Sequence, residues 1–75
     1  MRNYEVLRKG DQINTLDGYL TITGSNGSGI IWFTRTREDE DGNEETTEET
    51  ATLYDLQCEA KDFDGKNHKY IYEAN

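Results

Sequence analysis

The sequence predicts an all-β protein, a single small antiparallel barrel over residues 1–75, and three observations favour this class. Asp-Gly occurs three times, in LDGY (16–19), EDGN (40–43) and FDGK (63–66). Asp-Gly between strand-like segments is a strong hairpin signal, because a type I′ turn needs positive φ at both central residues. The chain also has five Tyr and one Trp for a core, and no Pro, which disordered linkers usually contain. We therefore expect three β-hairpins.

Composition limits the chain to one domain with a thin core. Only 13 of the 75 residues are Leu, Ile, Val or Phe. The single cysteine, Cys58, allows no disulfide within the chain and excludes a disulfide-rich secreted fold. The longest apolar run, at 30–33, is too short to span a bilayer, and the N-terminus lacks the apolar stretch of a signal peptide. We expect a soluble cytoplasmic protein without membrane association.

The formal net charge of −8 is concentrated in one segment. Residues 38–50 contain eight acidic and no basic residues, whereas the rest of the chain has eight of each. Solubility alone needs no such concentration, since a scattered excess of charge serves as well. The sequence therefore indicates a neutral body that carries one strongly acidic segment.

The first hairpin is predicted around a two-residue loop at 17–18. In that register Ile13 faces Ile22 and Leu20 faces Thr15, on opposite strands. The period of two in a strand then places Ile13, Leu20 and Ile22 on one face, as a buried sheet requires. A flexible Gly/Ser loop at 24–29 connects this hairpin to the second one.

The second hairpin is predicted to be long, with an acidic tip. A turn at 41–42 pairs Arg35 with Glu48, and a slip of the turn to 42–43 pairs Arg37 with Glu48 instead. Either register sets an arginine against a glutamate across the ladder. A helix is disfavoured here, because β-branched Thr and a central Gly both oppose it.

The third hairpin is predicted around residues 64–65. Its register places Cys58 opposite Ile71 on an inward face, and Glu59 opposite Tyr70 on an exposed face. His68 is expected on the same exposed side, opposite Lys61.

A short helical turn is expected near residues 53–57, just before this hairpin. Thr52 and Asp55 have the spacing of a capping box, and Leu53 and Leu56 would share the buried face of the turn. Strands at 4–7 and 68–73 would complete the barrel.

Residues 9–22 carry a resemblance to small SH3-like barrels. They contain the pattern G-D-x-I-x-T-x-x-G-x-x-x-I, formed by Gly10, Asp11, Ile13, Thr15, Gly18 and Ile22. The resemblance implies a compact barrel that acts as a binding module, without specifying a ligand. In size and acidity the chain is also similar to the small inhibitors that phages and mobile elements encode, anti-CRISPR proteins included.

The acidic hairpin at 38–49 is the first candidate binding site. A strand pair spaces carboxylates on one face by roughly 6.6 Å, twice the rise per residue. Such a row can imitate nucleic-acid phosphates and occupy a basic groove of a protein partner. The alternative is a solvated tip that prevents aggregation between sheet edges. The candidate residues are Glu38, Asp39, Asp41, Glu44, Glu45, Glu48 and Glu49.

An aromatic face is the second candidate site, with Trp32, Tyr70 and Tyr72 as its residues. Tyr and Trp are enriched at interaction hot spots, so an exposed cluster would indicate a protein-interaction or assembly module. The alternative for Trp32 is a place in the thin core. The expected assembly state is a monomer or weak homodimer, with a protein partner and no direct binding of nucleic acid.

Catalytic and metal chemistry are not expected. With Gly42 at position 6 of a calcium loop, Asp39, Asp41 and Glu48 fall at ligand positions, but Arg37 occupies the first position and flanking helices are missing. One Cys and one His do not make a zinc site. The prediction is therefore a non-enzymatic protein without a cofactor.

Overall fold

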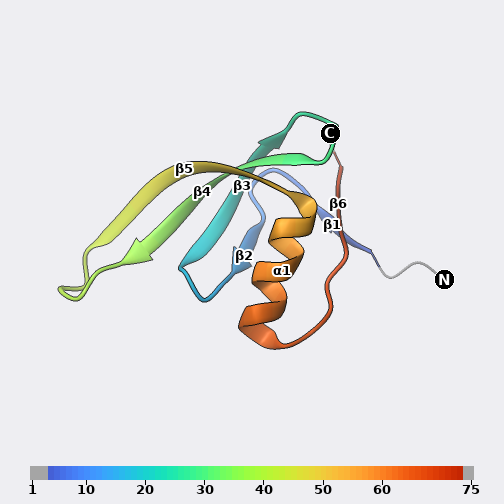
Figure 1. The fold of residues 1–75 in the computed structure, drawn as a ribbon. Coiled ribbons are helices and arrows are strands. Elements are labelled where there is room, and N and C mark those ends of the chain that lie inside the picture. Colours follow the sequence, from blue (N-terminus) through green and yellow to red (C-terminus); the bar gives the residue numbers. More distant parts are fainter. Residues whose placement is uncertain (1–3, 74–75) are drawn as a thin grey trace.

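The computed structural model describes residues 4–73, which form an open four-stranded sheet, one helix and a short second sheet (Figure 1). The elements are β1 (Glu5–Leu7), β2 (Gln12–Asn14), β3 (Tyr19–Ser25), β4 (Ile30–Glu38), β5 (Glu44–Thr52), α1 (Leu53–Asp64) and β6 (Tyr70–Tyr72). The larger sheet is antiparallel in the order β2-β3-β4-β5, and β1 pairs with β6 in parallel. The predominance of strands agrees with the prediction, but in the described residues the two sheets do not join into a closed barrel.

Strands β2 and β3 pair two residues away from the predicted register, with Ile13 opposite Leu20 instead of Ile22. The connecting loop is longer than two residues because Thr15 closes it, donating its amide and its hydroxyl to the Gly18 carbonyl at 3.0 and 2.7 Å. A shift of two residues leaves every side chain on its original face. Ile13, Leu20 and Ile22 are therefore all buried, as predicted.

Strands β4 and β5 form the expected long hairpin in a different register, with Arg35 opposite Thr47. Its loop is built around Asp39, whose Oδ1 accepts the backbone N–H groups of Asp41 and Asn43 at 2.9 and 2.8 Å. This side-chain cap replaces the predicted two-residue turn. Because the register moves by one residue from the first prediction, the alternate set of β5 side chains faces the core, including Ala51.

The predicted third hairpin is wrong, because residues 53–64 form α1. The capping box is present: the Asp55 amide donates to Thr52 Oγ1 at 3.1 Å, and the Thr52 amide donates to the Asp55 carboxylate at 3.4 Å. The helix ends at Gly65, which has φ of 74° and donates its amide to the Lys61 carbonyl. The third Asp-Gly is thus a helix C-cap, for which a left-handed glycine is as suitable as for a turn. The expected pairing of Cys58 with Ile71 does not occur, and Cys58 is exposed.

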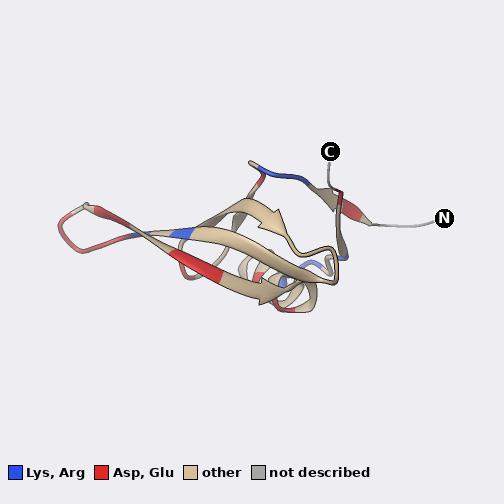
Figure 2. Cartoon of the chain, turned by 90° about the horizontal axis from the view of Figure 1, so that it is seen from above, with Lys and Arg blue, Asp and Glu red and all other residues tan. Residues whose placement is uncertain are grey.

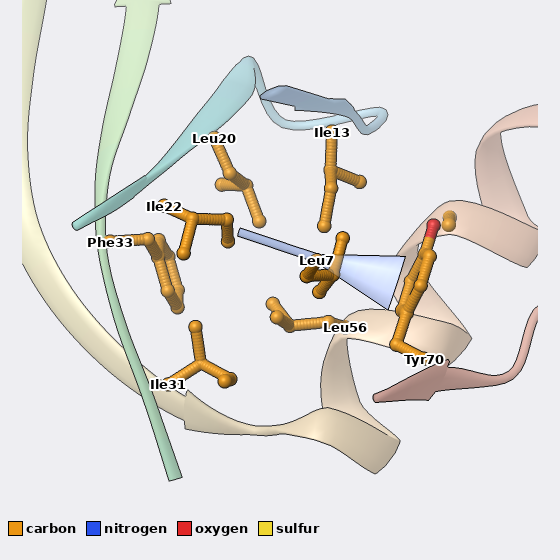
Figure 3. Close-up of a cluster of buried hydrophobic side chains, with 9 residues drawn as sticks. Leu7, Ile13, Leu20, Ile22, Ile31, Phe33, Leu56 and Tyr70 are labelled. Atoms are coloured by element: carbon orange, nitrogen blue, oxygen red, sulfur yellow. The ribbon is translucent and has the colours of Figure 1, made fainter. Parts of the chain in front are cut away.

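The core lies between one face of the larger sheet and α1, with β1 and β6 beside them. Side chains from β3 and β4 converge on Leu7 of β1 and Leu56 of α1 (Figure 3). Tyr70, which was expected on an exposed face, is only 7% exposed and belongs to this core, so that expectation is wrong. The buried residues are Leu7, Ile13, Leu20, Ile22, Ile31, Phe33, Leu56, Ala60 and Tyr70.

Candidate functional site

The β4–β5 hairpin extends beyond the rest of the molecule, and acidic residues surround its end (Figures 1 and 2). We call the acidic residues at 38–48 the acidic tip. All of them are exposed, and within residues 4–73 none of them forms an ion pair. The tip therefore presents its negative charge without ion-pair partners, and Glu45 is the member that lies opposite a basic residue, Arg37, across the ladder. Its members are Glu38, Asp39, Glu40, Asp41, Glu44, Glu45 and Glu48.

Two acidic residues of the tip face each other directly across the ladder. Glu38 is the register partner of Glu44 at the last pair before the loop. Like charges opposite one another destabilise a strand pair by some tenths of a kcal/mol. Glu48, further along β5, lies opposite Thr34 on the same outer face as Glu44. The arrangement of the tip is therefore not explained by the stability of the hairpin itself.

Glu49 was predicted to belong with these acids, but the structure places it among basic side chains. Both of its carboxylate oxygens accept from Nε of Arg35, at 3.1 and 3.2 Å, and one also accepts from the Thr47 hydroxyl. Burial raises the pKa of Glu49, but the hydrogen bonds from Arg35 and Thr47 outweigh it and lower that pKa overall. The Glu49 carboxylate thus binds Arg35 within the hairpin and is not part of the exposed acidic surface.

Arg35 is the centre of this group, and only 4% of it is exposed. Its Nη2 donates to both carboxylate oxygens of Glu59 in α1, at 2.9 and 3.1 Å, and its Nη1 donates to the Asp17 carbonyl at 2.8 Å and the Thr15 hydroxyl at 3.3 Å. One guanidinium group therefore ties β4 to β5, to α1 and to the β2–β3 loop. A guanidinium group is costly to bury alone, and here its hydrogen bonds to the carboxylates of Glu49 and Glu59 offset that cost.

Arg37 adds a second contact at the base of the hairpin. Its Nε and Nη2 each donate to the Asp17 carboxylate at 2.8 Å, and Nη2 lies 3.6 Å from Glu49. The hydrogen bonds from Arg37 lower the pKa of Asp17. We call Asp17, Arg35, Arg37, Glu49 and Glu59 the arginine cluster. It anchors the hairpin to the body. The predicted pairing of Arg35 or Arg37 with Glu48 across the ladder is wrong, because Arg35 lies opposite Thr47 and Arg37 opposite Glu45.

The predicted aromatic face is not formed. Trp32 lies on the outer face of the larger sheet and is 43% exposed. Tyr70 is buried in the core, and Tyr72 packs against that core from the other sheet. Because inward and outward positions alternate along β4, Trp32 points away from Ile31 and Phe33, which are buried. Of the three aromatic candidates, Trp32 alone remains exposed enough to contact a partner through its ring.

His68 is held between two carboxylates, which the sequence did not predict. Its Nδ1 lies 2.5 Å from Glu5 of β1, and its Nε2 lies 2.9 Å from Asp64 at the end of α1. The hydrogen bond with Glu5, and then that with Asp64, raises the pKa of His68 against the opposing effect of burial. The ring stacks on Tyr70 with centroids 5.6 Å apart. No spacing in the sequence brings Glu5 to His68, since the contact depends on the parallel pairing of β1 with β6.

The described part of the chain has neither a cluster of metal-ligating side chains nor a helix that could cross a membrane. Its His, Cys, Asp and Glu side chains form no group of three or more that could hold a metal ion. Its helix is neither long nor apolar enough to cross a bilayer.

Comparisons with models of protein families, with curated proteins and with solved structures found no match, so the function has to be inferred from the residues of this chain.

Proposed function

We propose that this protein is a non-enzymatic binding protein that presents its acidic tip to the basic surface of a protein partner. The observation that carries the proposal is the pairing of Glu38 with Glu44, exposed like charges that lie opposite each other and form no ion pair within residues 4–73. An arrangement that weakens the hairpin by itself is favourable once a cationic surface covers it. Complementary charge also speeds the encounter of the two partners.

The arginine cluster supports this proposal because it makes the base of the hairpin rigid. Arg35 fixes the hairpin to α1, and Arg37 fixes it to the β2–β3 loop. A surface that is ordered before binding loses less conformational entropy when the complex forms. The tip itself is ordered by Asp39, which accepts two backbone N–H groups of the loop. The backbone that carries the carboxylates is thus ordered before a partner arrives.

A nucleic-acid-binding groove is the basic surface that we propose as the target. Carboxylates spaced along two paired strands resemble a row of phosphates, for which Lys and Arg side chains in such grooves are arranged. The small size and acidity of the chain, similar to those of inhibitors from phages and mobile elements, agree with this role. The protein would act as a DNA mimic that excludes nucleic acid from its partner. The SH3-like character of residues 9–22 likewise stays a proposal about fold.

The second candidate function is a protein-interaction or assembly module that binds through an aromatic surface, with the tip as a solvated end. The exposure of Trp32 on the outer face of the sheet favours it. Binding of this kind depends on apolar contact and is nearly independent of salt, whereas binding through the tip weakens steeply as salt screens the charges. The salt dependence of the affinity therefore separates the two functions.

The proposal is tested by calorimetric titration with a deca-lysine peptide between about 25 and 300 mM salt, a range in which screening changes strongly. The triple variant Glu38→Lys, Asp41→Lys, Glu44→Lys should lower the affinity at least about tenfold and flatten its salt dependence. A matched pair of single variants locates the effect. Glu44→Lys should weaken binding, whereas Asp62→Lys, the same charge change on the exposed side of α1, should leave it nearly unchanged.

Two results would overturn the proposal. One is an unchanged affinity in the triple variant, and the other is an equal loss in both single variants, which would reflect net charge alone. The target class is tested on a partner captured from a cell extract and eluted with salt. Duplex DNA should displace this protein from that partner, and a complex that resists DNA would exclude the mimic role.

A further inference from the structure

We propose that the outer face of the larger sheet has a receptor pocket for one arginine side chain of the basic partner, formed by Trp32 and Glu48. This inference rests on the proposed function and adds to it a specific contact outside the loop of the tip. Trp32 and Glu48 line one open hollow of about 570 Å³, together with Thr23, Thr34 and Thr50. These residues come from β3, β4 and β5.

Gly24 positions the indole ring of Trp32. The two residues are register partners across β3 and β4, next to an irregularity in the pairing. A Cβ atom at Gly24 would lie 3.1 Å from Cε3 and 3.7 Å from Cζ3 of Trp32, which is tighter than ordinary contact for the nearer atom. The φ angle of Gly24 is outside the left-handed region, so its backbone does not require glycine. The missing side chain instead makes room for the ring to lie against the strand.

Glu48 provides the negative charge beside this ring. Thr50 is the register partner of Trp32, and Glu48 lies two residues before Thr50, so that both side chains project from the same face of the sheet. Diagonal neighbours of this kind are within reach of long side chains. Glu48 is exposed and makes no ion pair in the described residues. The Glu48 carboxylate, which has no ion-pair partner in the described residues, therefore lies beside the exposed indole ring of Trp32.

An arginine side chain fits this pair of groups. A guanidinium group stacks on an indole by cation–π attraction, and its planar fork donates two hydrogen bonds to a carboxylate. A lysine ammonium shares the positive charge but lacks the flat surface for stacking and the fork. The threonine side chains around the hollow offer methyl groups to the alkyl part of the arginine. The proposed function supplies the source, because a nucleic-acid-binding groove is rich in arginine.

The experiment follows Trp32, the single tryptophan of the chain, by NMR of the ¹⁵N-labelled protein. The probe is Nα-acetyl-argininamide, and the expected result is a saturable shift of the Trp32 indole N–H signal with a Kd on the order of millimolar, as for a single side-chain contact. Nα-acetyl-lysinamide should bind at least about threefold more weakly. Nα-acetyl-norleucinamide, which keeps the alkyl chain without the charge, should give no saturable shift.

Two glutamate variants form the matched control. Glu48→Gln should weaken binding of the arginine probe at least about threefold, because the amide keeps the shape and loses the charge. Glu44→Gln removes an exposed acid from the same strand and face without touching the hollow, and its affinity should equal that of the wild type. Gly24→Ala should also weaken binding, since its methyl group displaces the ring.

Three results would overturn the inference: no saturable shift with the arginine probe, equal losses for Glu48→Gln and Glu44→Gln, or equal binding of the norleucine probe, which would indicate a merely apolar site. Failure of the inference is distinct from failure of the proposed function. The triple tip variant leaves Trp32 and Glu48 intact, so the two experiments are independent. If the wild type binds deca-lysine through the tip but gives no saturable shift with the arginine probe, only the pocket proposal is wrong. If the arginine probe binds but the tip variants do not change the affinity for deca-lysine, only the proposed role of the tip is wrong.

Discussion

Arg35 and Glu59 connect the middle of the longest hairpin to the only helix of the described chain, through two hydrogen bonds of 2.9 and 3.1 Å from one guanidinium nitrogen. Arg35 is nearly fully buried, and its remaining donors are used by Glu49 and the β2–β3 loop. In a chain with few aliphatic side chains, this ion-pair network occupies a position that would otherwise belong to an apolar residue.

Replacing Arg35 should destabilise the protein strongly. We expect Arg35→Ala to lower the free energy of unfolding by about 3–5 kcal/mol, because Glu49 and Glu59 lose their partner in a partly buried site. Urea denaturation followed by far-UV circular dichroism measures the change. Arg35→Lys keeps the charge without the fork and should lie between the wild type and Arg35→Ala. Arg37→Ala, at a more exposed position, should cost much less, and an equal cost at both arginines would contradict the central role of Arg35.

Two glycines with similar backbone angles should respond very differently to alanine. Gly18 and Gly65 have φ of 80° and 74°. A Cβ atom at Gly18 would lie 2.2 Å from the Thr36 carbonyl oxygen, whereas a Cβ atom at Gly65 would meet no atom within 4 Å. Gly65→Ala should therefore cost about 1 kcal/mol for the left-handed backbone alone. Gly18→Ala should cost clearly more in thermal unfolding, and equal shifts in Tm for the two variants would show that the clash is relieved at no cost.

Stability should fall as pH rises above about 6.5 because of His68. Its pKa is raised in the folded protein, mainly by the hydrogen bond with Glu5 and then by that with Asp64, above the ordinary value of 6.5. The folded state therefore holds the proton more tightly than the unfolded state, and the stabilisation is present in full below about pH 6.5 and is lost as pH rises through the folded pKa. The urea midpoint of the wild type should decrease over this range. The difference between the wild type and His68→Gln isolates the effect, and parallel curves would exclude it.

The capping box should contribute to the stability of α1. Thr52→Ala removes the hydroxyl that accepts the Asp55 amide, and we expect a loss of about 1 kcal/mol in the free energy of unfolding. Thr50→Ala is the matched control. Thr50 is an exposed threonine of the same strand, its side chain projects from the same face of the sheet as that of Thr52, and it caps no helix. Equal effects of the two substitutions on urea denaturation would mean that the cap has no role.

The buried faces of β2 and β3 were predictable from the sequence, but the turns and the inward face of β5 were not. Ile13, Leu20 and Ile22 are buried in spite of the shifted register, because a shift of two residues does not change the face of a strand. The third Asp-Gly was misassigned because a left-handed glycine serves a hairpin and a helix end equally well. The capping box at Thr52 was the local signal for the start of the helix, but the residues after 57 were assigned to a strand and instead continue the helix to Asp64.

The candidate site was predictable where it depends on local charge and not where it depends on tertiary contacts. The acidic tip follows from the run of acids around Gly42, and the structure places it at the exposed end of a hairpin. Glu49 looked identical to its neighbours, but the helix supplies Glu59 on the other side of Arg35 and encloses the pair. The setting of Trp32 against Gly24 depends on the pairing irregularity in β3, for which the sequence carries no separate signal.

The parallel ladder of β1 and β6 has a consequence for the order of folding. It joins residues from nearly opposite ends of the chain, whereas the β4–β5 hairpin joins near neighbours. Closing so large a loop costs more entropy than closing a hairpin. Leu7 and Tyr70 should therefore enter the core in the last step, and the amides of these two short strands should be the first to exchange with deuterium in the native protein.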